Sequence, residues 1–178
     1  MSASSITKKY LSLHETERCT LRPLVLEDAQ WWMTFFEDEG SLQYFPQSMR
    51  HKPNASSQWI EKQLNRYSEN AFGLLAVLDL ETQQPLGQIG LLLQEVNGHA
   101  MLEVGYHLLP SARGRGIARE ISSYLVEWGL AHTDFSEIIS IIHPDNIPSQ
   151  KVAESNGMTR GPIVDYKGIP VYIYSTSS

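Results

Sequence analysis

Three apolar segments in the middle of the chain are joined by links that are too short for anything but tight turns. FGLLAVLD, LGQIGLLLQE and AMLEVGYHLL are separated by short links around ETQQP and NGH. Links of this kind join antiparallel strands, because parallel strands require a crossover of a dozen or more residues. Residues 72–109 therefore predict an antiparallel meander at the centre of the fold.

Strand and helix patterns also precede the meander. CTLRPL alternates as a strand does, and Asp28 in the following LEDAQWWMTFFEDE is a candidate N-cap for an amphipathic helix. SSQWIEKQLNRYSE has apolar residues at helical spacing and predicts a second amphipathic helix.

After the meander, helices and strands continue to alternate. Residues 116–132 predict a helix, and EIISIIH is typical of a strand covered on both faces. Pro148 and Gly157 bracket a short helix, and Lys167-Gly168 marks a final hairpin. The chain is therefore predicted to be α/β (α+β), with a mixed, mostly antiparallel central sheet flanked by helices.

Composition limits the class of protein. A chain of 178 residues with 42% hydrophobic and 19% charged residues fits a single globular domain over 1–178. We expect residues 1–16 to be a loosely ordered N-terminal extension of this domain. The net charge of −6 argues against nucleic acid as a partner, because phosphate affinity requires a basic face.

The N-terminus and the single cysteine indicate the compartment. MSASSITKKY is polar and is followed by no apolar run of signal-peptide or membrane-spanning length. Cys19 cannot form an intramolecular disulfide and is expected to be a core residue. We therefore expect a cytoplasmic protein with no membrane partner. We also expect no metal site, and the sequence leaves open whether the protein is a monomer or a homodimer.

Residues 108–120, LLPSARGRGIARE, place two glycines and three arginines between a predicted strand and a predicted helix. A helix N-terminus presents unpaired backbone N–H groups and a positive dipole end, which together favour an anion. Gly114 and Gly116 let the backbone approach such a ligand closely, and Arg113 and Arg115 add positive charge. The turn predicts a phosphate or pyrophosphate site, and the alternative is a connector with solvated arginines.

Two common phosphate-binding loops are excluded by the residues around this turn. A P-loop ends in Lys followed by Ser or Thr, but here Gly116 is followed by Ile117 and Ala118. The dinucleotide-binding fingerprint requires Gly or Ala where this chain has Arg119. An antiparallel meander also precedes the turn, whereas both of those loops open a βα unit.

The turn resembles the acyl-coenzyme-A loop of the GNAT N-acetyltransferase superfamily, Gln/Arg-x-x-Gly-x-Gly/Ala. Arg113, Gly116 and Ala118 fill that signature. The resemblance extends over almost the whole chain and looks closest to the RimJ/RimL-like branch. It is carried also by ERCTLRPL with EDA, by LEVGYHLLPSARGRGIARE, and by HPDNIPSQKVAESNGM.

This resemblance implies the GNAT fold, acetyl-CoA as cofactor, and direct transfer of its acetyl group to a primary amine of a peptide N-terminus or a small molecule. It implies that the pyrophosphate binds at the turn and that pantetheine pairs with the exposed strand edge at Tyr106, His107 and Leu108. The implied cofactor-binding residues at the turn are Arg113, Gly114, Arg115, Gly116, Ile117 and Ala118.

Glu103 is the candidate general base. In LEVGYHL it shares one strand face with His107, whereas Leu102, Val104 and Tyr106 share the other face. If the other face is core, Glu103 points toward the cofactor side, near where an acceptor amine would arrive. The amine attacks only when it is neutral, so a base or a water chain must remove a proton. A half-solvated strand glutamate is the alternative interpretation of Glu103, and His107 is a weaker candidate base.

Asn146-x-x-Ser149 matches a later element of the family. The resemblance implies that Ser149 donates a hydrogen bond to the departing thiolate and that Asn146 is a polar residue on the cofactor side. The alternative is a turn asparagine that precedes a helix-start serine, which is a useful capping arrangement by itself.

The acceptor pocket is expected along Trp31–Met49 and the final hairpin, with aromatic walls and with Glu37, Asp38 and Glu39 supplying acidity. Three functions remain open from the sequence: an acetyl-CoA-dependent N-acetyltransferase, a catalytically silent acyl-CoA-binding or regulatory module, and a plain nucleotide-binding protein. The third is disfavoured because the turn lacks both the Lys-Ser/Thr pair of a P-loop and the third glycine of the dinucleotide-binding fingerprint.

Overall fold

The computed structural model describes residues 3–12, 14–50 and 52–176, and an eight-stranded sheet runs through them. Its order is β1-β2-β3-β4-β5-β6-β8-β7, and within this described part every neighbouring pair is antiparallel except β5 and β6. The strands are β1 (His14–Glu15), β2 (Cys19–Pro23), β3 (Phe72–Asp79), β4 (Pro85–Val96), β5 (His99–Leu108), β6 (Ile138–Ile142), β7 (Thr159–Tyr166) and β8 (Ile169–Ser175).

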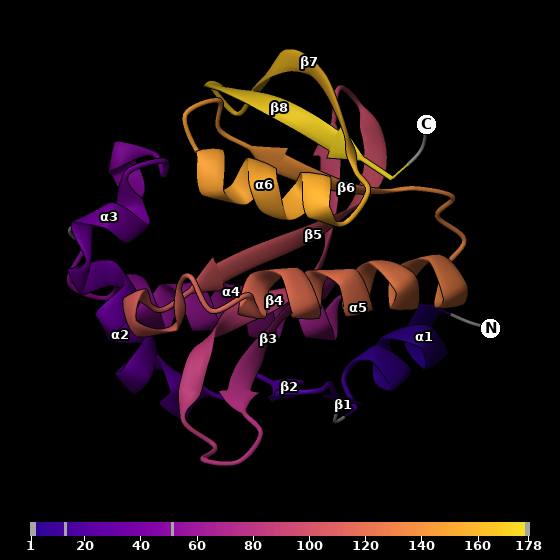
Figure 1. The fold of residues 1–178 in the computed structure, drawn as a ribbon. Helices are drawn as coiled ribbons and strands as arrows, with labels where there is room; N and C mark the ends of the chain where they lie inside the picture. The colour runs from indigo at the N-terminus through magenta and orange to yellow at the C-terminus, as the bar shows by residue number, and fades with distance from the viewer. Residues whose placement is uncertain (1–2, 13, 51, 177–178) are drawn as a thin grey trace.

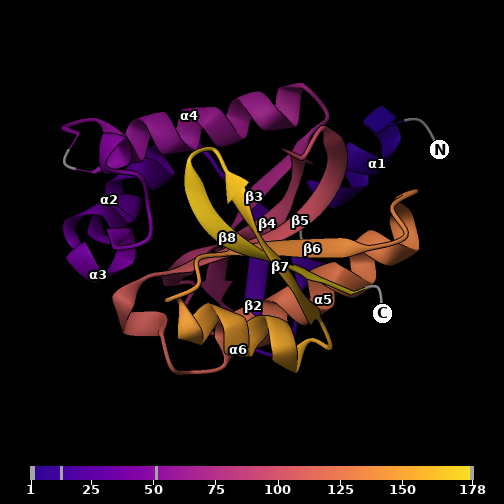
Figure 2. The same cartoon turned by 90° about the horizontal axis from the view of Figure 1, so that it is seen from above.

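Helices lie on both sides of the sheet, as Figures 1 and 2 show. Seen from above in Figure 2, α4 lies on one side of the strands and α5 with α6 on the other. The α-helices are α1 (Ala3–Tyr10), α2 (Ala29–Glu37), α3 (Glu39–Leu42), α4 (Ala55–Ser68), α5 (Ile117–His132) and α6 (Ile147–Ser155). Short 3₁₀ turns cover Leu26–Asp28, Gln47–Met49 and Pro110–Ala112. Helices of the described chain are too short or too polar to cross a membrane.

The predicted meander is confirmed as β3, β4 and β5. The link between β4 and β5 consists of Asn97 and Gly98, whose φ angles of 51° and 77° suit a tight hairpin turn. The final hairpin is confirmed as well, with Lys167 and Gly168 at φ 54° and 82°. Both turns could be predicted from local sequence because few residue types adopt positive φ readily, with glycine and asparagine the most common.

The sheet opens between β5 and β6. Their parallel pairing is limited to Leu102 with Ile138 and Glu103 with Ile139. β6 then continues antiparallel to β8, whereas β5 continues along β4 as far as Leu108. Residues 104–108 therefore have no main-chain pairing with β6, and we call this split in the sheet the β5–β6 gap.

Two apolar clusters pack on opposite faces of the sheet. One includes Leu102 and Val104 of β5 together with Ile121 of α5. The other includes Leu92 of β4 with Trp59 of α4 and further aromatic residues of α2. Glu103 stands opposite Leu92 in the β4–β5 register, so it belongs to the face that α2 and α4 cover. The prediction that the even residues of β5 face one core and Glu103 the other face is confirmed. Glu103 was expected on the cofactor side, but its face is the one opposite α5 and the turn that precedes it.

Two local expectations are wrong. The N-terminal segment is not loosely ordered where it is described: α1 ends at Tyr10, which is fully buried and whose hydroxyl bridges the Gly73 carbonyl and the Leu91 N–H. Residues 1–2 and 13 lie outside the described residues. Asp28 precedes α2 but does not cap it; its carboxylate instead accepts two hydrogen bonds from Arg22.

Candidate active site

The turn before α5 is an open cradle of N–H groups. Gly114 and Gly116 adopt the left-handed conformation, with φ 71° and 78°. Among the described residues, the N–H groups of residues 114–119 have no hydrogen-bond partner, and the first α5 bond is donated by Glu120 to the Gly116 carbonyl. A Cβ at Gly114 would meet nothing within 4 Å. These unpaired donors and this free space fit the pyrophosphate of an acyl-CoA.

The arginines of the turn are paired with carboxylates. Arg113 lies 3.0 Å from Asp38, donates to the Ser41 hydroxyl, and donates to the Leu108 carbonyl at 3.2 Å. Arg115 lies 3.7 Å from Asp79. The affinity for an anion thus depends more on the N–H groups than on the net charge of Arg113 and Arg115.

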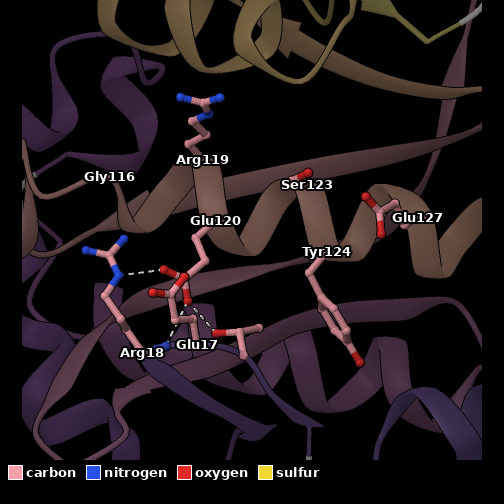
Figure 3. Close-up of a pocket in the computed structure, with 9 residues that line it drawn as sticks. Glu17, Arg18, Gly116, Arg119, Glu120, Ser123, Tyr124 and Glu127 are labelled. Carbon is pink, nitrogen blue, oxygen red and sulfur yellow. Dashed lines mark hydrogen bonds and ion pairs between the residues drawn. The ribbon is translucent and has the colours of Figure 1, made fainter.

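Arg119 is a basic residue that the sequence reasoning did not select. It extends from the first turn of α5 toward α6 (Figure 3), and within the part of the chain that the structure describes it forms no ion pair. Its position in the first helical turn was readable from the sequence, but the direction of its side chain was not. Arg119 therefore places a positive charge, outside the ion pairs found among the described residues, in the first helical turn beside the cradle.

Contacts from Arg18 and Thr16, which we call the Arg18 latch, hold the first turn of α5 against the segment before β2. Arg18 pairs with Glu120 at 2.6 Å and donates to the Arg115 carbonyl at 2.8 Å, while Thr16 donates to the same Glu120 carboxylate at 2.6 Å (Figure 3). Burial alone would raise the pKa of Glu120, but the hydrogen bonds from Thr16 and Arg18 lower it below its usual value. This carboxylate is therefore ionised and neutralised beside the cradle.

The β5–β6 gap exposes main-chain groups of β5. The Ser140 hydroxyl of β6 donates to the Val104 carbonyl at 3.0 Å, so the main-chain groups of Val104 face β6. Alternate residues of a strand direct their N–H and C=O groups to the same side, so those of Tyr106 and Leu108 face the gap as well. The main chain of His107 faces β4 instead, which refines the predicted strand edge.

Ser149 and Asn146 lie at the wide end of the gap, where α6 begins. The Tyr106 hydroxyl donates to the Ser149 carbonyl at 2.8 Å. Burial raises the pKa of Tyr106, and hydrogen bonds with the Ser140 and Ser149 side chains oppose that shift. Asn146 caps α6, because its Oδ1 accepts the Ser149 N–H at 3.2 Å. The capping interpretation of Asn146 therefore holds, and the Ser149 side chain lies beside the Tyr106 hydroxyl.

Glu103 lies at the narrow end of the gap, on the opposite face. It is 8% exposed and accepts a hydrogen bond from the Gln94 side chain at 2.7 Å. Burial raises its pKa; the Gln94 hydrogen bond, the Ile141 N–H across the gap, and the charges of Arg66 and Lys167 oppose that rise. Glu103 is therefore a desolvated carboxyl held by neutral donors, which suits a proton acceptor near neutral pH better than a surface glutamate would.

His107 lies among aromatic rings on the same face. Its ring centroid is 5.3 Å from that of Trp59, 5.6 Å from Phe45 and 5.8 Å from Phe35. Burial lowers its pKa to about 4, so the imidazole is neutral at physiological pH. His107 is therefore packed among aromatic rings as part of the lining of the site, whereas the Glu103 carboxyl is held by a hydrogen bond.

The segment after α2 closes one side of the site. Tyr44 stacks on His143 with ring centroids 5.1 Å apart and donates to the Asp145 carbonyl at 2.9 Å. Asp38, expected to supply acidity to an acceptor pocket, is instead paired with Arg113 and Ser41. Glu37 and Glu39 are exposed. Among the described residues, no His, Cys, Asp and Glu side chains group as metal ligands do.

The structure thus combines a split mixed sheet, a cradle of N–H groups at a helix N-terminus and a buried carboxyl beside the split. A family model described as "Acetyltransferase (GNAT) domain" matches residues 18–159. The chain belongs to the GNAT acetyltransferase family.

Relatives and solved structures agree with this assignment. An uncharacterized N-acetyltransferase, p20 of Bacillus licheniformis, is 28% identical over 167 residues, which cover 90% of this chain and 93% of that protein. An acetyltransferase from Agrobacterium tumefaciens is 25% identical with a TM-score of 0.77, covering 92% of this chain and 93% of that chain. RimL, a ribosomal L7/L12 alpha-N-protein acetyltransferase in complex with coenzyme A, is 16% identical with a TM-score of 0.74, covering 92% and 97%, and shows a common fold.

Proposed function

We propose that this protein transfers the acetyl group of acetyl-CoA directly to a primary amine of a peptide N-terminus or a small molecule. One observation supports the proposal: pairing between β5 and β6 stops after Glu103, so the sheet is split between the face with the N–H cradle and Ser149 and the face with Glu103. A thioester bound from the cradle side reaches an amine on the other side only through such an opening.

The cofactor contacts follow from the geometry of the cradle and the gap. The N–H groups of residues 114–119 bind the pyrophosphate, with Arg119 adding the positive charge that Arg113 and Arg115 have committed to carboxylates. The main-chain groups of Tyr106 and Leu108 pair with the amide groups of pantetheine, as an added strand would. Asn146 contributes by fixing the start of α6.

Acetyl-CoA supplies the thioester, and the residues of this chain manage the protons. Glu103 accepts the proton that the acceptor amine loses as its nitrogen forms the new C–N bond. Ser149 donates a hydrogen bond to the sulfur as the C–S bond breaks, from a position beside the Tyr106 hydroxyl. The Tyr106 N–H, directed into the gap, stabilises the negative charge that develops on the acetyl oxygen.

The acceptor enters on the face of α2 and α4. Aromatic side chains there surround the neutral imidazole of His107, so the walls near the gap are largely apolar. RimL, a structural neighbour, is described as an alpha-N-protein acetyltransferase, which supports a peptide N-terminus as one class of acceptor. A small amine with an apolar body is the other class.

An acceptor panel tests the proposal. Thiol release from acetyl-CoA is followed with peptides of different N-terminal residues, polyamines and aminoglycosides, alongside dissociation constants for acetyl-CoA, free CoA and ATP. We expect acetyl-CoA and CoA to bind, ATP to bind weakly, and at least one amine to accelerate thiol release. Binding without acceleration by any amine would instead support the silent acyl-CoA-binding module.

Glu103→Gln separates a catalytic carboxyl from a structural one. The variant retains size and can still accept the Gln94 hydrogen bond, so acetyl-CoA affinity is expected to be unchanged while the rate falls roughly 10²–10⁴-fold at neutral pH. Because the pKa of Glu103 is raised, the wild-type rate falls as the pH drops through it. In the variant this acidic limb disappears, and the deficit shrinks at high pH, where more acceptor is already neutral. Parallel pH–rate profiles would exclude Glu103 as the base.

A further inference from the structure

Glu103 belongs to a hydrogen-bonded chain that continues beyond the site just described. Gln94 of β4 donates from Nε2 to the Glu103 carboxylate at 2.7 Å, and its Oε1 accepts from the Tyr166 hydroxyl at 2.9 Å. In the sheet, β5, β6 and β8 lie between β4 and β7, the strand that ends at Tyr166. The tip of the β7–β8 hairpin curls back over the sheet toward α4, which brings Tyr166 to Gln94 (Figure 2).

We propose that Tyr166 is a positioning residue that fixes the orientation of the Gln94 amide and thereby keeps Glu103 in the carboxylate form that accepts a proton. The proposal rests on the proposed function only for its catalytic consequence. The control of Glu103 by Tyr166 through Gln94 depends only on the hydrogen bonds from Gln94 to Glu103 and from Tyr166 to Gln94.

The Gln94 amide is asymmetric, with a donor NH₂ group on one side and an acceptor oxygen on the other. A carboxylate only accepts hydrogen bonds, so the amide must turn its NH₂ group toward an ionised Glu103. Its oxygen then points away and needs a donor, and the Tyr166 hydroxyl is that donor. With the amide reversed, its oxygen would face the Glu103 carboxyl, which would then have to be protonated to donate. The direction of donation from Tyr166 and the ionisation of Glu103 are therefore linked.

The other groups around Glu103 do not provide this control. The Ile141 N–H of β6 donates to the carboxylate whichever way the amide points. Arg66 of α4 and Lys167 of the hairpin turn act through their charges, without a hydrogen bond to Glu103 among the described residues. The Tyr106 hydroxyl is directed to the other face, where it donates to Ser149. Gln94 is thus the side chain through which Tyr166 acts.

Tyr166→Phe removes the hydroxyl and keeps the ring that lies under the Lys167 ammonium at 4.8 Å. Tyr172→Phe is a matched control: Tyr172 is on the same hairpin and has the Arg160 guanidinium 4.9 Å from its ring, but its hydroxyl takes no part in the chain. The primary readout is the titration of the Glu103 carboxyl, followed by carbon NMR in protein labelled at the glutamate side-chain carboxyls. Glu103→Gln assigns the signal.

We expect Tyr166→Phe to raise the titration midpoint of Glu103 by about 0.5–1 pH unit, the size expected for one neutral hydrogen bond, and Tyr172→Phe to leave it in place. The acidic limb of kcat/KM moves by the same amount, with acetyl-CoA affinity unchanged. An unchanged midpoint in Tyr166→Phe overturns the proposal. A shifted midpoint with an unmoved limb supports control by Tyr166 and contradicts Glu103 as the base, so the two failures are distinguishable.

Gln94→Met provides a second variant that does not depend on Tyr166→Phe folding well. It removes the connecting amide and is expected to raise the Glu103 midpoint at least as much. Adding Tyr166→Phe to Gln94→Met should then cause no further shift, because the path between the two residues is already broken. An additional full shift in the double variant would show that Tyr166 acts independently of Gln94 and would overturn the relay.

Discussion

Ser149 combines an observed structural position with a proposed chemical role. Its N–H donates to Asn146 and its carbonyl accepts from Tyr106, so these two contacts remain in an alanine variant, which loses only the side-chain hydrogen bond with Tyr106. Ser149→Ala should therefore leave the fold intact. If the hydroxyl donates to the departing thiolate, the substitution should add roughly 1–3 kcal/mol to the barrier, lowering kcat about 5- to 150-fold with little change in acetyl-CoA affinity.

Ser155→Ala is the control for that measurement. Ser155 is at the other end of α6, where its hydroxyl donates to the Val152 carbonyl at 2.7 Å. Steady-state kinetics at saturating acetyl-CoA should show a large loss of kcat for Ser149→Ala and almost none for Ser155→Ala. Equal turnover in the two variants would reduce Ser149 to a helix-start residue.

Glu103 and His107 illustrate what a local pattern can predict about a site. Alternation along β5 placed them on one face, and the structure confirms this because a strand has a fixed period of two. Their different environments depend on distant residues: Gln94 and Ile141 contact Glu103, whereas rings from α2 and α4 surround His107. Such contacts have no signature in a short stretch of sequence.

At the scale of elements, the turn before α5 is held by the Arg18 latch in addition to the contacts of its own arginines. Arg18→Ala would free the Arg115 carbonyl and leave the Glu120 carboxylate without its cation beside the cradle. Since Arg18 is about half exposed, we expect only a roughly 2- to 5-fold weaker affinity for acetyl-CoA. The turnover number at saturating acetyl-CoA should be retained.

Titration calorimetry of acetyl-CoA binding, combined with steady-state kinetics, measures this effect. Arg160→Ala is a suitable control because Arg160 covers the Tyr172 ring on the final hairpin and lies outside the latch. A fall in kcat with unchanged acetyl-CoA affinity would contradict the role assigned to Arg18, because the latch has no contact with the reacting end of the gap.

The elements that the sequence predicted well are those with local signals. The β4–β5 link of the meander and the final hairpin are two-residue turns with positive φ, and Gly157, with φ 76°, follows the end of α6 at Ser155. Helix α1 was missed because its burial depends on Tyr10 bonding to Gly73 and Leu91, more than 60 residues away along the chain. Asp28 has the residue type and position of an N-cap, but its carboxylate is paired with Arg22 and does not cap α2.

At the scale of the whole molecule, the site depends on one topological feature. The single parallel pair in the described sheet lets β5 and β6 diverge, and the proposed reaction requires a ligand on the α5–α6 face to reach the α2–α4 face at that split. The net charge of −6 opposes an anionic cofactor at long range. Binding must therefore come from short-range donors, and the N–H cradle of residues 114–119 is where they are concentrated.

The most direct test of the account is acetyl-CoA binding by Gly116→Val, with Gly98→Val as its matched control. Both glycines have nearly equal positive φ, 78° and 77°, so a valine costs each turn a similar strain of about 1–2 kcal/mol. At Gly98 the added Cβ meets nothing within 4 Å, and at Gly116 its nearest neighbour is an Arg18 guanidinium nitrogen at 3.5 Å.

Calorimetry should therefore find both variants folded, with wild-type affinity for acetyl-CoA in Gly98→Val and an affinity at least about 100-fold weaker in Gly116→Val, where the branched side chain occupies the pyrophosphate position. Wild-type affinity in a folded Gly116→Val variant would contradict the account, because acetyl-CoA would then not bind at the turn before α5.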